Sequence, residues 1–420
     1  MKKICIQSNL LQSISYCSVL TISLLMVPNV ITKLFGHEHL WVIAQYLFAA
    51  LSIVLGLLNG IKFDFLSKKI LPLHLFGLLI VTLTIISSAH SISLKSFSNL
   101  VKFFPIYCLA ILNVRLFIHT VEMCWGFLAL LISLSSFLMA ILFLQGATLF
   151  QLDFAAFPLD SIGYLGATAR STFFHTADIL KMRLQGWAWE PAAHAYFLIP
   201  AFFYFCTKYS QKNGHSRVKR LFFIFSALIL AASLFSTKSL GALVSILVTF
   251  FLFTIIRKRN MGIKIFISAL VIAGGVIALP FILLWANAET SLPIRWEVFL
   301  IALAAWSNDP MLILFGAGYL NDESISPLLT GQTNSLIRSF SYFGLPFSIF
   351  WYSLILGFVG LAFKSKLHQK HDYLRYSLVC LCIFNISLDL SYSPPFFLIL
   401  TCISIASYLK KSDLSFEHVS

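Results

Sequence analysis

The chain has 420 residues, of which 59% are hydrophobic and 11% charged, and its formal net charge is +14. Soluble domains carry about 25% charged residues, and the charged faces that a water-soluble helical protein needs are missing here. Repeated apolar runs of about 18 residues or more are long enough to cross a bilayer. The composition therefore excludes a soluble protein and predicts an all-α polytopic membrane protein.

The apolar runs predict about twelve transmembrane helices within a single integral membrane domain, 1–420. A long bent helix over 221–256 is the alternative to two spans there, but Ser236, Lys238 and Gly241 are typical of a tight polar turn. Lys2 precedes the first run as in a signal peptide, but no small-residue cleavage site follows, so we expect a membrane helix. The expected spans are 10–32, 40–60, 70–90, 98–117, 122–145, 190–207, 221–236, 239–256, 265–285, 337–362, 376–392 and 394–409.

The positions of lysine and arginine predict how the chain is oriented. Most of the 30 basic residues lie in alternate connections, and cytoplasmic connections are the ones enriched in Lys and Arg. Both termini are therefore predicted to be cytoplasmic, and the basic charge is a topological signal that does not imply nucleic-acid binding. The connections predicted to be cytoplasmic are 1–9, 61–69, 115–121, 208–220, 257–264, 364–375 and 410–420.

Two of the connections on the opposite side are long, 146–189 and 286–336. They hold most of the polar, aromatic and charged residues that a catalytic face needs. Because function concentrates in loops that a rigid scaffold positions, we expect it there.

The first long loop ends in a dense polar cluster, with Arg183, Trp187, Trp189, Glu190 and His194 within twelve residues of sequence. A proline follows Glu190 and fits the first turn of a helix, so Glu190 is expected at the helix entrance. His194 would then lie one turn further on the same face. The alternative is an interface anchor, with the indoles in an aromatic belt and the arginine extending to headgroups.

The second long loop contains 291–306, which reads as an amphipathic helix led by Arg295. A helix lying on the membrane surface is the alternative explanation for it. Asp322 and Asn334 follow, and Arg338 is expected close to a membrane entrance, as Arg183 is.

Taken in order, these motifs resemble those of a known family. They are R-x-x-G-x-x-x-E-P at 183–191, S-x-G-A at 239–242, the Arg-led helix, T-N-S-L at 333–336 and G-x-P at 344–346. This order resembles that of the bacterial O-antigen and exopolysaccharide polymerases, within the O-antigen ligase-like superfamily. The resemblance covers about 170–350, and its weight comes from the order of the motifs.

The resemblance implies a lipid-dependent glycosyltransferase of the bacterial inner membrane with a periplasmic active face. Such enzymes join repeat units linked to undecaprenyl pyrophosphate, and a chain-length regulator protein is an implied partner beside the membrane lipid. The resemblance implies no cofactor, and no metal-bridging carboxylate pair appears. The eight cysteines lie in apolar runs or beside predicted cytoplasmic ends, so neither disulfides nor a structural metal are expected.

The resemblance also implies roles for the residues singled out above. Arg183, Arg295 and Arg338 are expected to bind the pyrophosphate, because guanidinium groups bind phosphate oxygens bidentately and stay charged. Glu190 or His194 is the expected general base, and the residue types do not decide between them. The weaker expected contacts to sugar or acceptor are Trp187, Trp189, Asn334 and Asp322.

Two other functions remain as alternatives. An O-antigen ligase would transfer finished glycan to lipid A core, but ligases of the superfamily carry a His-Asn pair where this chain has Thr333 and Asn334. A transporter or flippase for lipid-linked oligosaccharides would bury polar groups at mid-membrane, often in inverted repeats. No such repeat is visible, so the sequence favours the polymerase.

Overall fold

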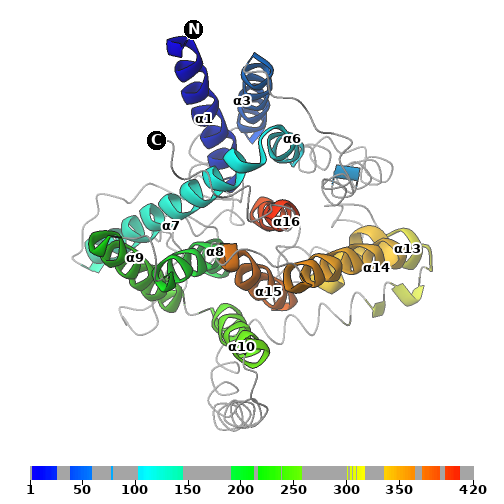
Figure 1. Ribbon diagram of the computed structural model, residues 1–420. Helices are drawn as coiled ribbons and strands as arrows, with labels where there is room; N and C mark the ends of the chain where they lie inside the picture. Colours follow the sequence, from blue (N-terminus) through cyan, green and yellow to red (C-terminus); the bar gives the residue numbers. More distant parts are fainter. Residues whose placement is uncertain are drawn as a thin grey trace.

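The computed structural model describes a set of ranges whose regular structure is entirely helical (Figure 1), as the sequence predicts. Four of these helices are long and apolar enough to cross a membrane: Leu40–Leu58, Val114–Leu138, Arg217–Ser236 and Gly344–Phe363. The chain is thus a helical membrane protein. The described residues are 2–25, 38–58, 77–78, 103–144, 191–211, 216–237, 239–257, 300, 303–304, 306–308, 310–316, 335–364, 371–387 and 393–406.

Apart from α13, the helices of these ranges fall where apolar runs predict spans; α13 lies within the expected second long loop, 286–336, after the expected amphipathic helix 291–306. The expected spans 70–90 and 265–285 lie outside the described residues, apart from 77–78, so the total of about twelve stays a prediction. The helices are α1 (Lys2–Leu25), α3 (Glu38–Leu58), α6 (Phe104–Leu112), α7 (Val114–Leu144), α8 (Pro191–Ser210), α9 (Arg217–Ser236), α10 (Leu240–Arg257), α13 (Pro310–Phe315), α14 (Ser335–Lys364), α15 (Asp372–Ser387) and α16 (Pro394–Ala406).

One predicted connection is wrong. Residues 115–121 are not a loop between spans, because α7 runs through them from Val114. The break lies instead at Asn113, whose extended backbone (φ −150°, ψ 94°) ends α6. The Asn113 Oδ1 accepts a hydrogen bond from the Leu116 amide at 3.1 Å. Asparagine is a strong helix N-cap, so this side chain, and not the charge of Arg115, marks the boundary.

The polar turn between α9 and α10 is confirmed, and the alternative of one long bent helix is wrong. The chain leaves α9 at Thr237, and α10 begins at Leu240. Thr237 Oγ1 donates to the Leu234 carbonyl at 2.7 Å and accepts from the Ser239 amide at 3.2 Å. These bonds satisfy backbone groups that a helix end leaves without partners.

The exposed faces of the long helices are apolar, as contact with lipid requires. On α3 the exposed residues recur every three or four positions, and they include Leu40, Ile43, Leu47, Leu51 and Val54. The outer faces of α7 and α9 are built in the same way. Water-soluble monomers rarely expose continuous apolar surface on this scale, so these stripes mark the faces that meet the bilayer.

Polar side chains are instead turned into the bundle, where they join helices. Between α1 and α3, Gln45 Nε2 donates to Ser23 Oγ at 2.7 Å, and Ser15 bonds to Ser52. Interhelical hydrogen bonds of this kind hold membrane bundles together, because lipid offers them no partners. The centre of the bundle is α16 (Figure 1), whose described side chains from 395 to 406 are all buried.

Candidate functional site

Most of the residues that the sequence singles out for chemistry lie outside the described part of the chain. His194 is described in full, and Arg338 is described as part of the α14 backbone. The structure therefore bears on the two helices that lead from the long loops. The residues outside the described ranges are Arg183, Trp187, Trp189, Glu190, Arg295, Asp322 and Asn334.

His194 lies in the first turn of α8, which begins at Pro191 as the sequence predicts. Its side chain is only 1% exposed. The ring Nε2 lies 3.3 Å from the hydroxyl of Ser233, near the end of α9. A neutral imidazole beside a hydroxyl suits this enclosed position, because a charged ring would lose its hydration without gaining a counter-ion from Ser233. The geometry makes His194 part of the α8–α9 contact.

Other polar contacts fix the same half of α8 against its neighbours. Asn385 of α15 donates from Nδ2 to the hydroxyl of Tyr196 at 3.2 Å. Trp125 of α7 donates from Nε1 to the Phe197 carbonyl at 2.9 Å. Three neighbouring helices thus hold the start of α8, which is the helix that follows Glu190. A reacting group at this entrance would sit on a rigid support.

Arg338 lies near the start of α14, in a segment that a kink sets apart from the rest of that helix. At Gly344 the backbone takes φ +73° and ψ 178°, a conformation that favours glycine. A Cβ at this position would clash with the carbonyl oxygen of Leu314 in α13. Gly344 therefore lets α13 pack against α14, and the G-x-P motif at 344–346 corresponds to this kink.

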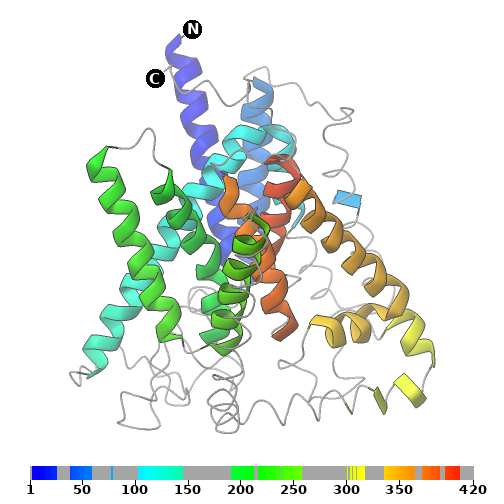
Figure 2. The same ribbon diagram turned by 60° about the horizontal axis from the view of Figure 1, so that its bottom comes forward.

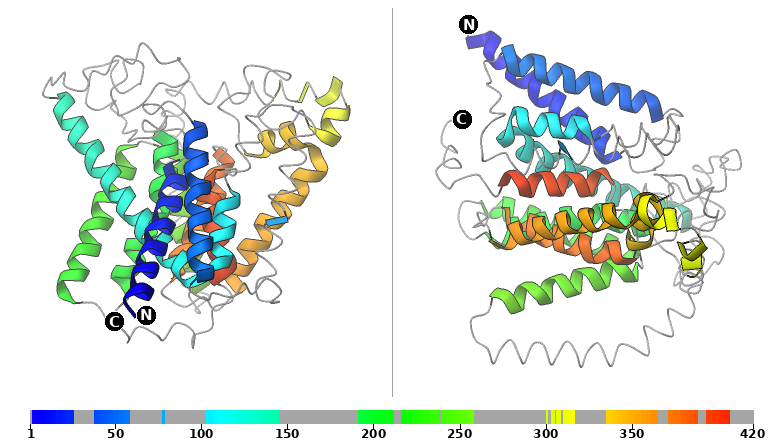
Figure 3. Two further views of the ribbon diagram at one scale, coloured as in Figure 1. Left: turned by 90° about the horizontal axis from the view of Figure 1, so that it is seen from above. Right: turned by 90° about the vertical axis from the view of Figure 1, so that its right-hand side faces the viewer.

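The first segment of α14 and α13 lie at one end of the bundle, and the start of α1 lies at the other (Figures 2 and 3). The end of α9, where Ser233 meets His194, lies at the same end as α13 (Figure 2). The two described site residues thus belong to one end of the molecule.

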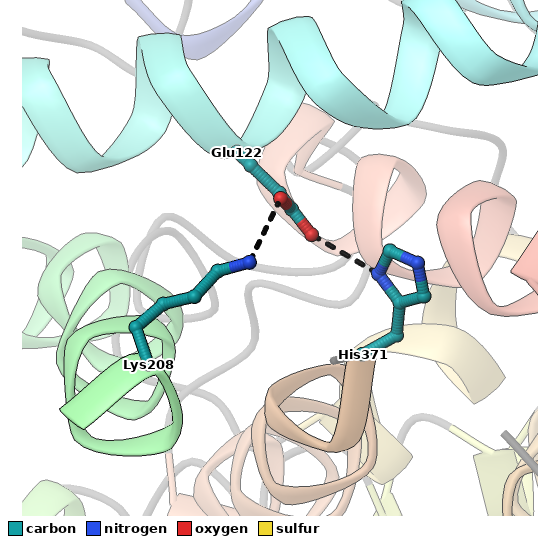
Figure 4. A network of polar contacts seen from close by, with 3 residues as sticks. All are labelled: Glu122, Lys208 and His371. Carbon is teal, nitrogen blue, oxygen red and sulfur yellow. Dashed lines mark hydrogen bonds and ion pairs between the residues drawn. The ribbon is translucent and has the colours of Figure 1, made fainter. Parts of the chain in front are cut away.

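The structure also shows a buried charged network that the sequence does not predict (Figure 4). Glu122 of α7 lies between Lys208, in the last turn of α8, and His371, just before α15. The Lys208 Nζ is 3.7 Å from Glu122 Oε2, and the His371 Nδ1 is 3.1 Å from Glu122 Oε1. Each of the three side chains is less than a tenth exposed.

The sequence shows the three ionisable residues of this network but does not show that they meet. Glu122, Lys208 and His371 each lie at or beside a predicted cytoplasmic end of a span, where they count as ordinary interface charges. Which ends of the helices meet is a property of the packing, and no local pattern encodes it. The contact among these three residues agrees with the prediction that the three helix ends lie on the same side of the membrane.

A carboxylate and an imidazole in contact are too few ligands for a structural metal ion. Within the ranges that the structure describes, no three His, Cys, Asp or Glu side chains gather as a metal site would need. Comparison of the sequence with known proteins identifies no family, because no family model and no curated protein matches this chain.

Proposed function

We propose that the chain is a polysaccharide polymerase of the bacterial inner membrane, which joins undecaprenyl-pyrophosphate-linked repeat units at the periplasmic face. The observation that carries the proposal is the order of the arginine-bearing motifs on two long loops of the same predicted side. In this proposal the protein has about twelve spans and two cytoplasmic termini. A chain-length regulator is its proposed partner.

In the proposed reaction the acceptor hydroxyl attacks the anomeric carbon of the donor glycan, and the bond to the lipid pyrophosphate breaks. Negative charge then develops on the leaving group. Arg183, Arg295 and Arg338 bind its oxygens, since preorganised cations stabilise such charge strongly away from water. Trp187, Trp189, Asn334 and Asp322 contact the sugar or the acceptor.

Glu190 is the proposed general base, and His194 has a supporting role. The burial of His194 against Ser233 supports this division, because a base must come within hydrogen-bonding distance of the proton that it takes. His194 then holds α8, the helix that follows Glu190 in the sequence, against α9. The acceptor proton passes to Glu190 as the glycosidic bond forms.

The proposal is tested by the glycan made in a strain that lacks the gene and carries variants. We expect Arg183→Ala and Arg295→Ala to abolish long chains and to leave single-repeat glycan, because pyrophosphate departure loses its stabilisation. The readout is a glycan ladder on a gel, with membrane levels of each variant checked by immunoblot.

Arg217→Ala is the matched control, because this exposed arginine begins α9 at the opposite end of the helix from Ser233. It should leave chain length unchanged. Normal chain length in stably expressed Arg183→Ala and Arg295→Ala proteins would refute the polymerase. Normal polymer that stays on the carrier lipid in the deletion strain would indicate a ligase instead.

A transporter of lipid-linked oligosaccharides is the second candidate, and the buried Glu122–Lys208–His371 network supports it. Ionisable side chains inside membranes commonly mark ion or substrate pathways. Purified protein in liposomes separates the two functions. A polymerase lengthens lipid-linked oligomers without moving them, whereas a transporter moves them without lengthening.

A further inference from the structure

The short helix α13 (Pro310–Phe315) carries apolar side chains that stay exposed. It contains no charged residue, and none of its residues is buried. Met311 is 61% exposed and Leu314 is 49% exposed, and at i, i+3 spacing they lie on one face of the helix. Exposed apolar surface of this kind marks a site of contact with protein or with a membrane. Yet α13 belongs by sequence to the second long loop, 286–336, and not to an expected span.

The position of α13 is fixed by its contact with α14. Figures 1 and 2 show α13 at the outer edge of the structure, beside the kinked helix α14. At the kink, the carbonyl oxygen of Leu314 lies so close to Gly344 that a Cβ there would clash with it. The helix is therefore held at the rim of the bundle, at the end opposite the start of α1 (Figure 3).

The level of this contact in the bilayer follows from the length of α14. The segment Gly344–Phe363 is long and apolar enough to cross a membrane. Its 20 residues rise by about 30 Å, which is the thickness of the hydrocarbon core. The helix ends at Lys364, and basic residues are common at the membrane surface. Gly344 therefore lies at the opposite surface of the hydrocarbon, and α13 contacts α14 at that level.

Exposed apolar residues of α14 continue the surface of α13 into the bilayer. Leu345, Ile349 and Leu356 are each more than a third exposed, and their spacing places them on one face of the helix. Leu345 directly follows Gly344, where α13 packs. The exposed face of α13 thus adjoins the stripe with which α14 faces lipid, so the two surfaces share one occupant.

We propose that α13 is an interfacial segment whose exposed face lies among the lipid acyl chains of the leaflet at this end of the bundle. Apolar helix faces at an interface enter the boundary between headgroups and acyl chains by about 5–10 Å. The second long loop is attached to the membrane at α13, and the attachment holds the kink of α14 at the lipid–water boundary. The proposal is independent of the polymerase, since it concerns contact with lipid and its test uses no glycan.

The test is photo-crosslinking of the full-length protein in lipid nanodiscs. Leu314→p-benzoylphenylalanine places a benzophenone on the exposed face of α13, and irradiation joins this group to C–H bonds that it contacts. Intact-protein mass spectrometry measures the yield of lipid adducts. The same substitution at Asn308, an exposed polar residue of the same loop, is the matched control for water contact. At Leu356, which is exposed within the span of α14, it is the control for lipid contact.

We expect the adduct yield at position 314 to approach the yield at position 356 and to exceed the yield at position 308 several-fold. Equal yields at positions 314 and 308 would overturn the proposal, because α13 would then be no closer to lipid than a polar residue of its loop. Crosslinks between two copies of the chain in place of lipid adducts would also overturn it, since a protein would then cover this face.

Met311→p-benzoylphenylalanine gives a second check should the variant at position 314 fold poorly. Met311 lies on the same face of α13 as Leu314 and is 61% exposed, so we expect the same several-fold excess of lipid adducts over position 308. Folding of each variant is compared with that of the wild type by gel filtration. A well-folded Met311 variant with no excess of lipid adducts would contradict the attachment of α13 to the bilayer.

Discussion

The two ends of α8 each hold a buried ionisable side chain, and they accommodate it in different ways. At the first turn, His194 is paired with the hydroxyl of Ser233, a neutral partner on one neighbouring helix. At the last turn, Lys208 is paired with the Glu122 carboxylate, which also holds His371. The first end therefore uses a single neutral hydrogen bond, and the last end uses a charged network across three helices.

The two ends differ because burial costs a different amount of free energy for each kind of side chain. An imidazole can stay neutral and needs only one polar partner, whereas a lysine beside a carboxylate depends on that charge to offset its lost hydration. Removal of the partner should therefore lower the free energy of unfolding only slightly at the first turn of α8 and strongly at the last turn. Unfolding measurements on variants at each end of α8 test this difference.

The largest effect is expected from Glu122→Gln. The substitution leaves the Lys208 ammonium buried beside a neutral amide, and the loss of one partner from a buried pair costs about 3–5 kcal/mol. Thermal unfolding of the purified protein in detergent should show a large fall in Tm. Asp372→Asn is the control, because the 3.3 Å pair of Asp372 with Arg375 is partly exposed and such pairs contribute about 0.2–1 kcal/mol. Equal losses in the two variants would contradict the comparison.

The second effect is a rescue. Glu122→Gln combined with Lys208→Met removes both charges, and replacement of a whole buried pair by neutral groups is often close to neutral in stability. We therefore expect the double variant to be more stable than Glu122→Gln alone. A double-mutant cycle built on the two single variants measures the coupling. Additive losses would show that Lys208 and Glu122 do not depend on each other.

The smallest effect is expected from Ser233→Ala at the first turn. It removes the hydroxyl from a neutral interhelical hydrogen bond, and such bonds in membrane proteins contribute on average about 0.6 kcal/mol. Ser236→Ala is the control, since the Ser236 hydroxyl bonds to the Ala232 carbonyl of its own helix. A loss at Ser233 as large as that of Glu122→Gln would refute the division between the two ends.

Local sequence predicted some parts of the fold closely. The start of α8 at Pro191 and the turn at Thr237 follow from proline and short polar residues, whose preferences act over a few positions. The kink at Gly344 was not predicted, although it lies in the G-x-P motif, where glycine permits the positive φ. The boundary at Asn113 differs from the prediction because hydropathy and the charge of Arg115 place the connection at 115–121, whereas the asparagine N-cap ends α6 earlier.

For the candidate site, the sequence predicts the types of residue and the position of His194 on its helix, but not how these residues pack. The predicted position of His194 in the first turn of a helix is confirmed, but its packing against Ser233 joins positions 39 residues apart. Such a contact depends on how α8 and α9 lie together. The roles of the other candidate residues remain predictions, since they lie outside the described ranges.

The amino-acid sequence alone predicts a helical membrane protein and the positions of most of its described helices, with α13 and the boundary between α6 and α7 as the exceptions. Transfer of an apolar helix into lipid depends on composition summed along one segment, which a linear sequence contains in full. Tertiary packing, which the sequence does not show, encloses α16 at the centre of the bundle. It also brings Glu122 into hydrogen-bonding distance of His371, which lies 249 positions away in the sequence. The lipid-facing and protein-facing sides of these helices are both apolar, so hydropathy could not predict which helices pack together.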